Sequence, residues 1–198
     1  PPERYKVEAL HEDMKKPEPV PGSTVPVPEM ASEVLGTAET ADVRKKTWID
    51  RYLSVSYPLR RIRITSPYGY RKDPFTGKRK FHGGIDLHAR SEKVLVMMDG
   101  VVVKVGQDKT SGKYVTLQHG NYLISYCHLS RVLAVKGAVV RPRDVVGITG
   151  STGRSTGEHL HITCKLNGKS INPMLLLDFI KVTQQECVSA LLQTKKSN

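Results

Sequence analysis

The sequence has no long hydrophobic run, and this absence argues against a membrane-spanning protein. No segment of the 198 residues approaches the roughly 20 apolar residues that a membrane-spanning helix requires. We therefore expect no transmembrane segment. The first residues, Pro1-Pro2-Glu3, also lack the basic and apolar layout of a secretory signal peptide. We expect either a cytosolic chain or a chain from which a leader has been removed.

Cysteine is scarce as well. The three cysteines, Cys127, Cys164 and Cys187, cannot all pair within one chain, and their spacing matches neither a zinc ribbon nor a redox pair. Alternation along extended strands would turn Cys127 and Cys164 away from the nearby His128 and His161. We expect buried free thiols, and a Cys127–Cys164 disulfide in an oxidising compartment is the alternative.

Positive charge is abundant but uneven. The chain has 31 Lys and Arg against 19 Asp and Glu, a net charge of +12. Residues 1–49 carry 7 Lys and Arg against 9 Asp and Glu, whereas residues 50–80 and 81–198 each have a net charge of +7. A basic domain favours a polyanionic partner, such as nucleic acid, an anionic membrane or an acidic cell-wall polymer. The chain has no recognition-helix signature, so we expect no nucleic-acid partner.

Proline and apolar spacing divide the chain into expected parts. Seven of the 12 prolines fall within residues 1–28, which predicts an extended linker. Near-helical apolar spacing over residues 30–53 predicts helix. We therefore expect residues 1–57 to be a proline-rich leader followed by a helical segment, acting either as an inhibitor or as a tether. Apolar residues from Leu175 to Leu192 also follow helical spacing, so we expect residues 178–198 to form a C-terminal helix and tail.

Between these parts, residues 58–177 consist of short β-rich runs. The runs are separated by glycines, and no internal repeat is visible. Regular short strands with glycine turns are typical of an antiparallel sandwich or barrel. The predicted fold class is mainly β, an antiparallel β-sandwich or barrel-like domain with short flanking helices.

Potential metal ligands are concentrated in two short motifs, His82-Gly-Gly-Ile-Asp86 and His159-Leu-His161. A catalytic zinc site uses three nitrogen or oxygen ligands from the protein and leaves the fourth position to water. The four candidate side chains therefore leave one to spare. On an extended strand His159 and His161 project from the same face. The two glycines after His82 argue against the helical arrangement of His-Glu-x-x-His proteases. We expect a zinc site built on strands and a loop.

Three other histidines are weaker candidates. His88 would share a strand face with Asp86, which makes it a rival ligand. His119 precedes the expected Gly120-Asn121 turn, so we expect a surface or hairpin residue. His11 lies in the proline-rich leader near acidic residues. It would be able to cap a metal in an autoinhibited state, but we expect a solvated segment.

The glycine-rich stretch 147–157 is not a phosphate-binding loop, because no register supplies the required Gly-Lys-Ser/Thr. Its small and hydroxylated residues suit a tight, mobile loop that delivers His159 to a substrate and contacts a peptide backbone. The run Lys78-Arg79-Lys80, just before His82, is either solvated surface or the rim of a cleft that contacts an anionic substrate.

Five blocks of sequence resemble the lysostaphin/LytM-type zinc metallopeptidases, which cut peptide cross-links in bacterial peptidoglycan. The resemblance covers residues 58–177, and the order of the blocks makes a chance match improbable. The blocks are Ile64-Thr-Ser-Pro-Tyr-Gly-Tyr-Arg71, His82-Gly-Gly-Ile-Asp86, Asp99-Gly-Val-Val102, Tyr126-Cys-His-Leu-Ser130 and Gly147-Ile-Thr-Gly-Ser-Thr-Gly-Arg-Ser-Thr-Gly-Glu-His-Leu-His161.

The resemblance implies that His82, Asp86 and His161 bind one zinc ion and that His128 and His159 are the catalytic pair. The chemistry of these residues agrees, because two imidazoles and one carboxylate complete a three-ligand shell. Two further histidines can supply a base and a hydrogen-bond donor for an attacking water.

Two roles stay open. The sequence does not say whether His128 or His159 is the base. Tyr126 shares strand parity with His128, so it either faces the same cleft or packs in the core.

The predicted function is a zinc-dependent endopeptidase that hydrolyses peptide cross-links or stem peptides of bacterial peptidoglycan. Its expected place is the cell envelope, periplasmic or secreted, once a leader has been removed. Some members of the family have lost ligands and activate other wall enzymes. The alternative is therefore a non-catalytic, wall-binding regulator, but the presence of all five site residues favours catalysis. The sequence indicates neither the bond that is cut nor the oligomeric state.

Overall fold

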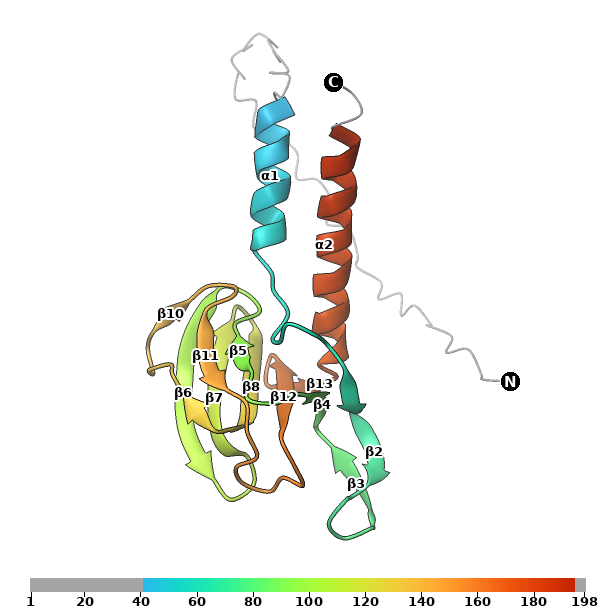
Figure 1. Cartoon of the computed structure of the whole chain (residues 1–198), viewed down its shortest axis with the longest axis vertical. Helices are drawn as coiled ribbons and strands as arrows, with labels where there is room; N and C mark the ends of the chain where they lie inside the picture. Colours follow the sequence, from blue (N-terminus) through green and yellow to red (C-terminus); the bar gives the residue numbers. More distant parts are fainter. Residues whose placement is uncertain (1–40, 195–198) are drawn as a thin grey trace, which may run out of the picture. The chain divides into compact units, whose positions relative to one another are not determined.

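A large antiparallel sheet brings the sequence motifs together on neighbouring strands (Figure 1). The structure is a computed structural model, and it describes residues 41–194. The sheet has eight strands. In order across the sheet they are β1 (Ile64–Ser66), β4 (Gly84–His88), β12 (His159–Leu166), β8 (Tyr122–Leu129), β7 (Gly112–His119), β6 (Gly100–Asp108) and β10 (Val139–Val140), with β13 (Lys169–Ile171) paired to β12. Because β12 pairs with both β4 and β8, three segments far apart in the chain lie side by side.

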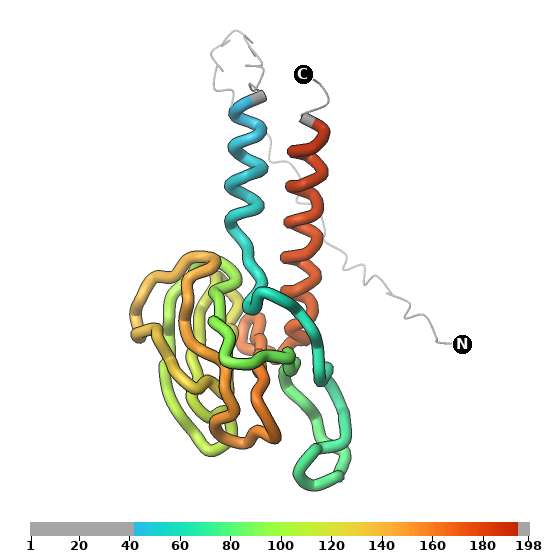
Figure 2. Tube along the Cα trace, in the orientation of Figure 1, coloured from blue at the N-terminus to red at the C-terminus, as the bar shows by residue number. Residues whose placement is uncertain are grey.

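Two smaller sheets complete the β structure of the described residues (Figure 1), and Figure 2 traces the path of the chain in the same orientation. One has three strands, in the order β5 (Lys93–Leu95), β11 (Val145–Ile148) and β9 (Arg131–Val132). The other is a hairpin of β2 (Gly69–Lys72) and β3 (Arg79–His82). This hairpin carries the first histidine of the candidate site at the end of β3.

The hydrophobic core lies between the large sheet and the three-stranded sheet. Leu160 and Ile162 of β12 and Tyr126 of β8 are buried together with Val94 and Val146 of the smaller sheet. Full burial of each aliphatic side chain contributes about 1.5–3 kcal/mol. Since alternate residues of a strand point to opposite faces, residues between these core positions face away from the core. That second face is where the histidines lie.

Among the described residues, two helices accompany the sheets, α1 (Ala41–Leu53) and α2 (Met174–Thr194). The start of α2 follows from the sequence, because the Asn172 side-chain oxygen accepts a hydrogen bond from the Met174 amide at 3.0 Å. Pro173 stands just before the helix, where a missing amide hydrogen costs nothing. The two helices run side by side in Figure 1, and an Arg51–Glu186 ion pair of 3.0 Å links them.

A β-bulge in β8 changes the direction of one functional side chain. Leu129 pairs with Lys113 and Tyr126 pairs with Val115, so Cys127 and His128 together stand opposite a single residue of β7. His128 adopts a left-handed backbone with φ of 63°, which is uncommon for a residue with a side chain. A bulge of this kind breaks the alternation of the strand and re-aims a side chain.

The predicted fold class is confirmed, although α2, at 21 residues, is longer than a short flanking helix. The predicted domain boundaries stay predictions. The proline-rich leader, His11 and the first part of the helix expected over residues 30–53 lie outside the described residues. Within residues 41–194, neither helix is long and apolar enough to span a membrane.

Candidate active site

The outer face of the large sheet forms the floor of a cleft of about 680 Å³. Strand alternation selects the residues that line it. On β12, His159 and His161 face the cleft, whereas Leu160 and Cys164 are buried on the core side. The prediction that the two histidines share one face is confirmed, as is the prediction that Cys164 turns away from His161.

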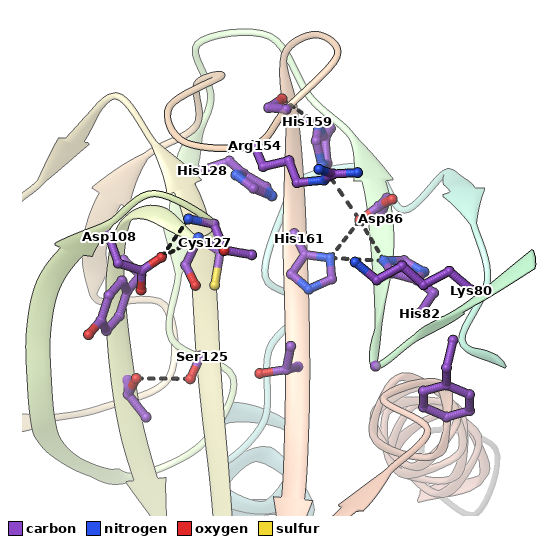
Figure 3. A pocket seen from close by; sticks show the side chains of 18 of the residues that line it. Lys80, His82, Asp86, Asp108, Ser125, Cys127, His128, Arg154, His159 and His161 are labelled. Atoms are coloured by element: carbon purple, nitrogen blue, oxygen red, sulfur yellow. Dashed lines mark hydrogen bonds and ion pairs between the residues drawn. The ribbon is translucent and has the colours of Figure 1, made fainter. Parts of the chain in front are cut away.

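Three potential ligands converge at one end of the cleft, His82, Asp86 and His161 (Figure 3). Asp86 Oδ1 lies 2.7 Å from His161 Nδ1 and 3.3 Å from His82 Nε2, and the two imidazole nitrogens are 3.1 Å apart. The other nitrogen of His82, Nδ1, bonds to the Pro67 carbonyl oxygen at 2.8 Å. Such a bond fixes the ring and leaves Nε2 free to bind a metal.

The donor set of this group fits zinc, because two imidazole nitrogens and one carboxylate oxygen are the ligands of many catalytic zinc sites. Burial raises the pKa of Asp86, but hydrogen bonds from His161 and His82 outweigh burial, and the pKa lies well below its usual range. The carboxylate is therefore ionised at neutral pH, as a metal ligand must be.

A second pair of histidines lies beside this group. The ring centroids of His128 and His159 are 4.8 Å apart, and His128 is 5.6 Å from His161 by the same measure. His128 Nδ1 contacts the Thr152 carbonyl oxygen at 2.8 Å, and His159 Nδ1 contacts the Gly157 carbonyl oxygen at 2.8 Å. A carbonyl oxygen can only accept, so each Nδ1 carries the proton and each Nε2 is left for other partners.

Burial lowers the pKa of His128, and the neighbouring His159 and His161 lower it further. Its ring is therefore neutral at pH 7, and its Nε2 can accept a proton. His159 Nε2 lies 3.6 Å from Asp86 Oδ1. The five residues of the predicted site thus meet in a single cleft.

The glycine-rich loop that precedes β12 is held tightly against β7. The Thr152 hydroxyl accepts a hydrogen bond from the Lys113 amide and donates one to the Leu129 carbonyl oxygen, at 2.9 and 2.8 Å. A Cβ at Gly112 would lie 2.3 Å from the Thr152 carbonyl oxygen, so only glycine fits there. The loop leads directly into His159 at the start of β12. It therefore positions both catalytic candidates, one through Thr152 and one through the chain itself.

An ion pair that sequence reasoning missed joins this loop to the β2–β3 hairpin. Arg154 of the loop binds Asp73 of the hairpin at 2.9 Å, and its guanidinium lies 4.2 Å from the centre of the Phe75 ring. All three line the cleft. Arg71 was missed as well, and its Nη2 is 3.6 Å from Asp86 Oδ2. Apart from their place in the motifs, nothing in the sequence marks these arginines.

Two expectations were wrong. Cys127 does not turn away from His128, because the bulge lets both line the cleft. For His119 only the surface alternative was wrong, because the residue is 4% exposed and its Nδ1 donates to the Asp99 carbonyl oxygen at 3.0 Å, whereas the hairpin alternative is confirmed by its pairing with Tyr122. It does stand at the end of β7, before the expected turn. Tyr126 is fully buried in the core, which settles its open role in favour of packing.

Other expectations were met in part. The cysteines among the described residues are Cys127, Cys164 and Cys187, and all three are buried free thiols. The rival ligand His88 is neither in the ligand group nor among the residues that line the cleft. Lys80 lines the cleft, as expected of a rim residue, whereas Lys78 and Arg79 do not.

The part of the chain that holds this cleft is similar to known proteins. Residues 80–173 match the family described as Peptidase family M23. The chain is 37% identical over 144 residues to the DD-carboxypeptidase/endopeptidase Mpg of Neisseria meningitidis, a match that covers 71% of this chain and 33% of that protein. It is 38% identical over 122 residues to the peptidoglycan DD-endopeptidase ShyA of Vibrio cholerae, covering 60% and 28%. The chain thus spans about a third of the length of these curated relatives.

Solved structures give the same result. A zinc-containing peptidase from Vibrio cholerae superposes with a TM-score of 0.52 at 31% identity, covering 62% of this chain and 38% of that one. The catalytic domain of lysostaphin from Staphylococcus simulans superposes with a TM-score of 0.54 at 26% identity, covering 61% and 92%. Residues 80–173 therefore form a domain of peptidase family M23, and its fold is similar to that of the lysostaphin catalytic domain.

Proposed function

We propose that this protein is a zinc-dependent endopeptidase that hydrolyses peptide bonds in the stem peptides or cross-links of bacterial peptidoglycan. The observation that carries the proposal is the convergence of His82, Asp86 and His161 on one point beside His128 and His159. The names of the relatives, a DD-carboxypeptidase/endopeptidase and a peptidoglycan DD-endopeptidase, support the substrate class. Because peptidoglycan lies in the cell envelope, we propose a periplasmic or secreted location.

In the proposed site, His82, Asp86 and His161 would hold one zinc ion. When bound, zinc supplies Lewis-acid polarisation and lowers the pKa of water toward ~7. The hydrogen bond from His82 Nδ1 to Pro67 and the contact of Arg71 with Asp86 Oδ2 orient two of the ligands before any metal arrives.

His128 is the proposed general base. Its ring is neutral because burial lowers its pKa, and Thr152 fixes its tautomer so that Nε2 carries the lone pair. As the water oxygen bonds to the carbonyl carbon of the substrate, Nε2 takes the proton of the water. The carbon–nitrogen bond then breaks as Nε2 passes this proton to the leaving amine.

His159 is the proposed hydrogen-bond donor to the oxygen that gains negative charge. His159 Nδ1 contacts the Gly157 carbonyl oxygen at 2.8 Å, and His159 Nε2 faces the cleft 3.6 Å from Asp86 Oδ1. An incoming oxyanion can replace Asp86 as the partner of Nε2. A single well-placed donor of this type is worth about 10²–10³ in kcat.

The experiment that tests the proposal is mass spectrometry of muropeptides after intact peptidoglycan has been incubated with the purified chain. Zinc-loaded protein should release new peptide fragments, and chelated protein should not. The His128→Ala variant, loaded with zinc, serves as the matched control without a base. New chelator-sensitive fragments would identify the bond that is cut. An unchanged profile from zinc-loaded protein would contradict the proposal and favour a non-catalytic, wall-binding regulator.

A further inference from the structure

The charged side chains that line the cleft do not balance. Five are cationic and three are carboxylates, and the cations come from four different strands and the glycine-rich loop. The cations are Arg71, Lys80, Lys104, Arg154 and Lys165, and the carboxylates are Asp73, Asp86 and Asp108.

Each carboxylate already has a cationic neighbour. Arg154 binds Asp73 at 2.9 Å, and Arg71 lies 3.6 Å from Asp86. Asp108 and Lys104 interact electrostatically, and the Lys104 amine also lies 5.2 Å from the centre of the Tyr114 ring. The excess positive charge of the cleft is therefore carried by the two remaining cations.

These two cations are Lys80 and Lys165. Within residues 41–194, neither lies within 4.0 Å of a carboxylate oxygen. Both are exposed to solvent. The ammonium group of an exposed lysine at a cleft wall is strongly hydrated and can exchange water for an anionic group of a substrate.

Strand geometry places both amines on the cleft side, at different distances from the histidines. Lys80 stands two residues before His82 on β3, and Lys165 stands four residues after His161 on β12. At roughly 3.3 Å per residue, the Cα separations are about 7 and 13 Å. In the view of Figure 3 the amine end of Lys80 points toward His161.

The floor between His161 and Lys165 is lined with hydroxyl groups. Thr163 of β12 pairs with Ser125 of β8, which pairs in turn with Thr116 of β7, so three hydroxylated residues form a row across three strands. The hydroxyls of Thr116 and Ser125 are 2.8 Å apart. Hydroxyl groups both donate and accept hydrogen bonds, so this floor can pair with the amides of an extended peptide that runs from the histidines toward Lys165.

We propose that Lys80 and Lys165 form a carboxylate-binding subsite that selects acidic peptides, with free carboxylates near the bond that is cut, over the same peptides in amidated form. The inference rests on the proposed function, because it assigns the substrate of the same cleft. Lys80 binds a carboxylate close to the scissile bond, and Lys165 binds one further along the peptide. Arg71 and Arg154 do not take this role, because carboxylates of the protein already occupy them.

The test uses two synthetic cross-linked stem peptides that differ in one respect. In one the glutamyl and diamino-acid carboxylates are free, and in the other they are carboxamides. Equilibrium binding is measured with the zinc-loaded His128→Ala full chain, which retains the cleft but lacks the base. Turnover is measured with the zinc-loaded wild-type chain. The wild-type chain should prefer the acidic peptide by at least about tenfold in kcat/KM, mainly through KM.

Lys80→Gln and Lys165→Gln should each weaken binding and kcat/KM for the acidic peptide by about fivefold, the size expected of a solvent-exposed charge pair. Neither substitution should change the values for the amidated peptide. Lys80→Arg and Lys165→Arg should restore the preference, and salt should weaken it. Lys169→Gln on β13, which removes an exposed lysine outside the cleft, should behave as the wild type.

The outcomes separate this inference from the proposed function. Cleavage of both peptides at equal rates would support the proposed hydrolytic function and contradict the proposed subsite. If the acidic peptide binds in a lysine-dependent way but the zinc-loaded wild-type chain does not cleave it, the subsite would be supported and the proposed hydrolytic function would be contradicted. Equal binding of the two peptides to the His128→Ala chain, or a preference unchanged in both glutamine variants, would overturn the subsite.

Discussion

Arg154 and Asp73 hold the glycine-rich loop and the β2–β3 hairpin together across the cleft. The guanidinium Nη2 lies 2.9 Å from Oδ1 and 3.1 Å from Oδ2 of Asp73. Asp73 Oδ1 also accepts hydrogen bonds from the amides of Phe75 and Thr76, both at 2.9 Å. Burial raises the pKa of Asp73, but these amides and the charge of Arg154 lower it to about 2. One ionised carboxylate therefore shapes the hairpin turn and anchors the loop that leads to His159.

Arg154→Ala should consequently reduce catalysis without removing the metal. The loop carries Thr152, which orients His128, and continues into His159, so loss of the anchor misplaces both rings. A misplacement of about 1 Å can cost up to ~10²-fold in rate, and we expect kcat/KM to fall by at least about tenfold. Steady-state kinetics and metal analysis of the same samples check this. The control is Arg90→Ala, which removes an exposed arginine outside the cleft. Normal kcat/KM in the Arg154→Ala chain would show that the anchor is dispensable.

The roles of the histidines can be separated by metal content. His161→Ala removes one of the three potential ligands and should lower both bound zinc and activity. His128→Ala leaves His82, Asp86 and His161 in place, so zinc content should stay at the wild-type level while kcat falls by about 10²–10⁴, the usual contribution of a general base. Zinc is measured by atomic absorption on dialysed protein. Normal turnover in the His128→Ala chain would remove this residue from the mechanism.

Much of the site follows from periodicity in the sequence. The prediction that His159 and His161 share one face required only the alternation of side chains along an extended strand, because β12 is regular at that point. The glycines after His82 correctly argued against a helical pair of ligands, because the structure places His82 at the end of β3 and Asp86 within β4. Local rules work where the backbone is regular.

The rest of the site depends on departures from regularity and on distant contacts. Strict alternation would have placed His128 on the core face with Tyr126, and the bulge that prevents this needs a left-handed backbone at a residue that is not glycine. Asn, Asp and His adopt a left-handed backbone more often than other non-glycine residues, but it is uncommon even for them. No local signal therefore predicted it at His128. The Arg154–Asp73 pair joins residues 81 positions apart, and only the three-dimensional arrangement reveals it.

The thiol of Cys127 should be inert even though it faces the cleft. Burial raises its pKa to about 12, so roughly one molecule in 10⁴ carries a thiolate at pH 8. Native protein incubated with iodoacetamide at pH 8 should leave Cys127 unmodified, as judged by peptide mass spectrometry, and urea-unfolded protein should be alkylated there. Rapid alkylation of Cys127 in native protein would mean that the cleft opens far more widely than the structure shows.

His119 should make the stability of the fold depend on pH. Burial lowers its pKa below the ordinary value of 6.5, so the unfolded chain binds a proton more readily than the native one does. The stabilising contribution of the neutral ring is complete above about pH 6.5 and is lost as the pH falls toward the native pKa. His119→Asn keeps a side-chain amide that can donate to the Asp99 carbonyl oxygen, which now accepts from Nδ1 at 3.0 Å, but it does not titrate. Urea unfolding of metal-free protein at pH 7.5, 6.5 and 5.5 should show the free-energy advantage of the wild type over this variant shrinking as the pH falls. An advantage that stays constant or grows over this range would show that His119 is not held neutral by burial.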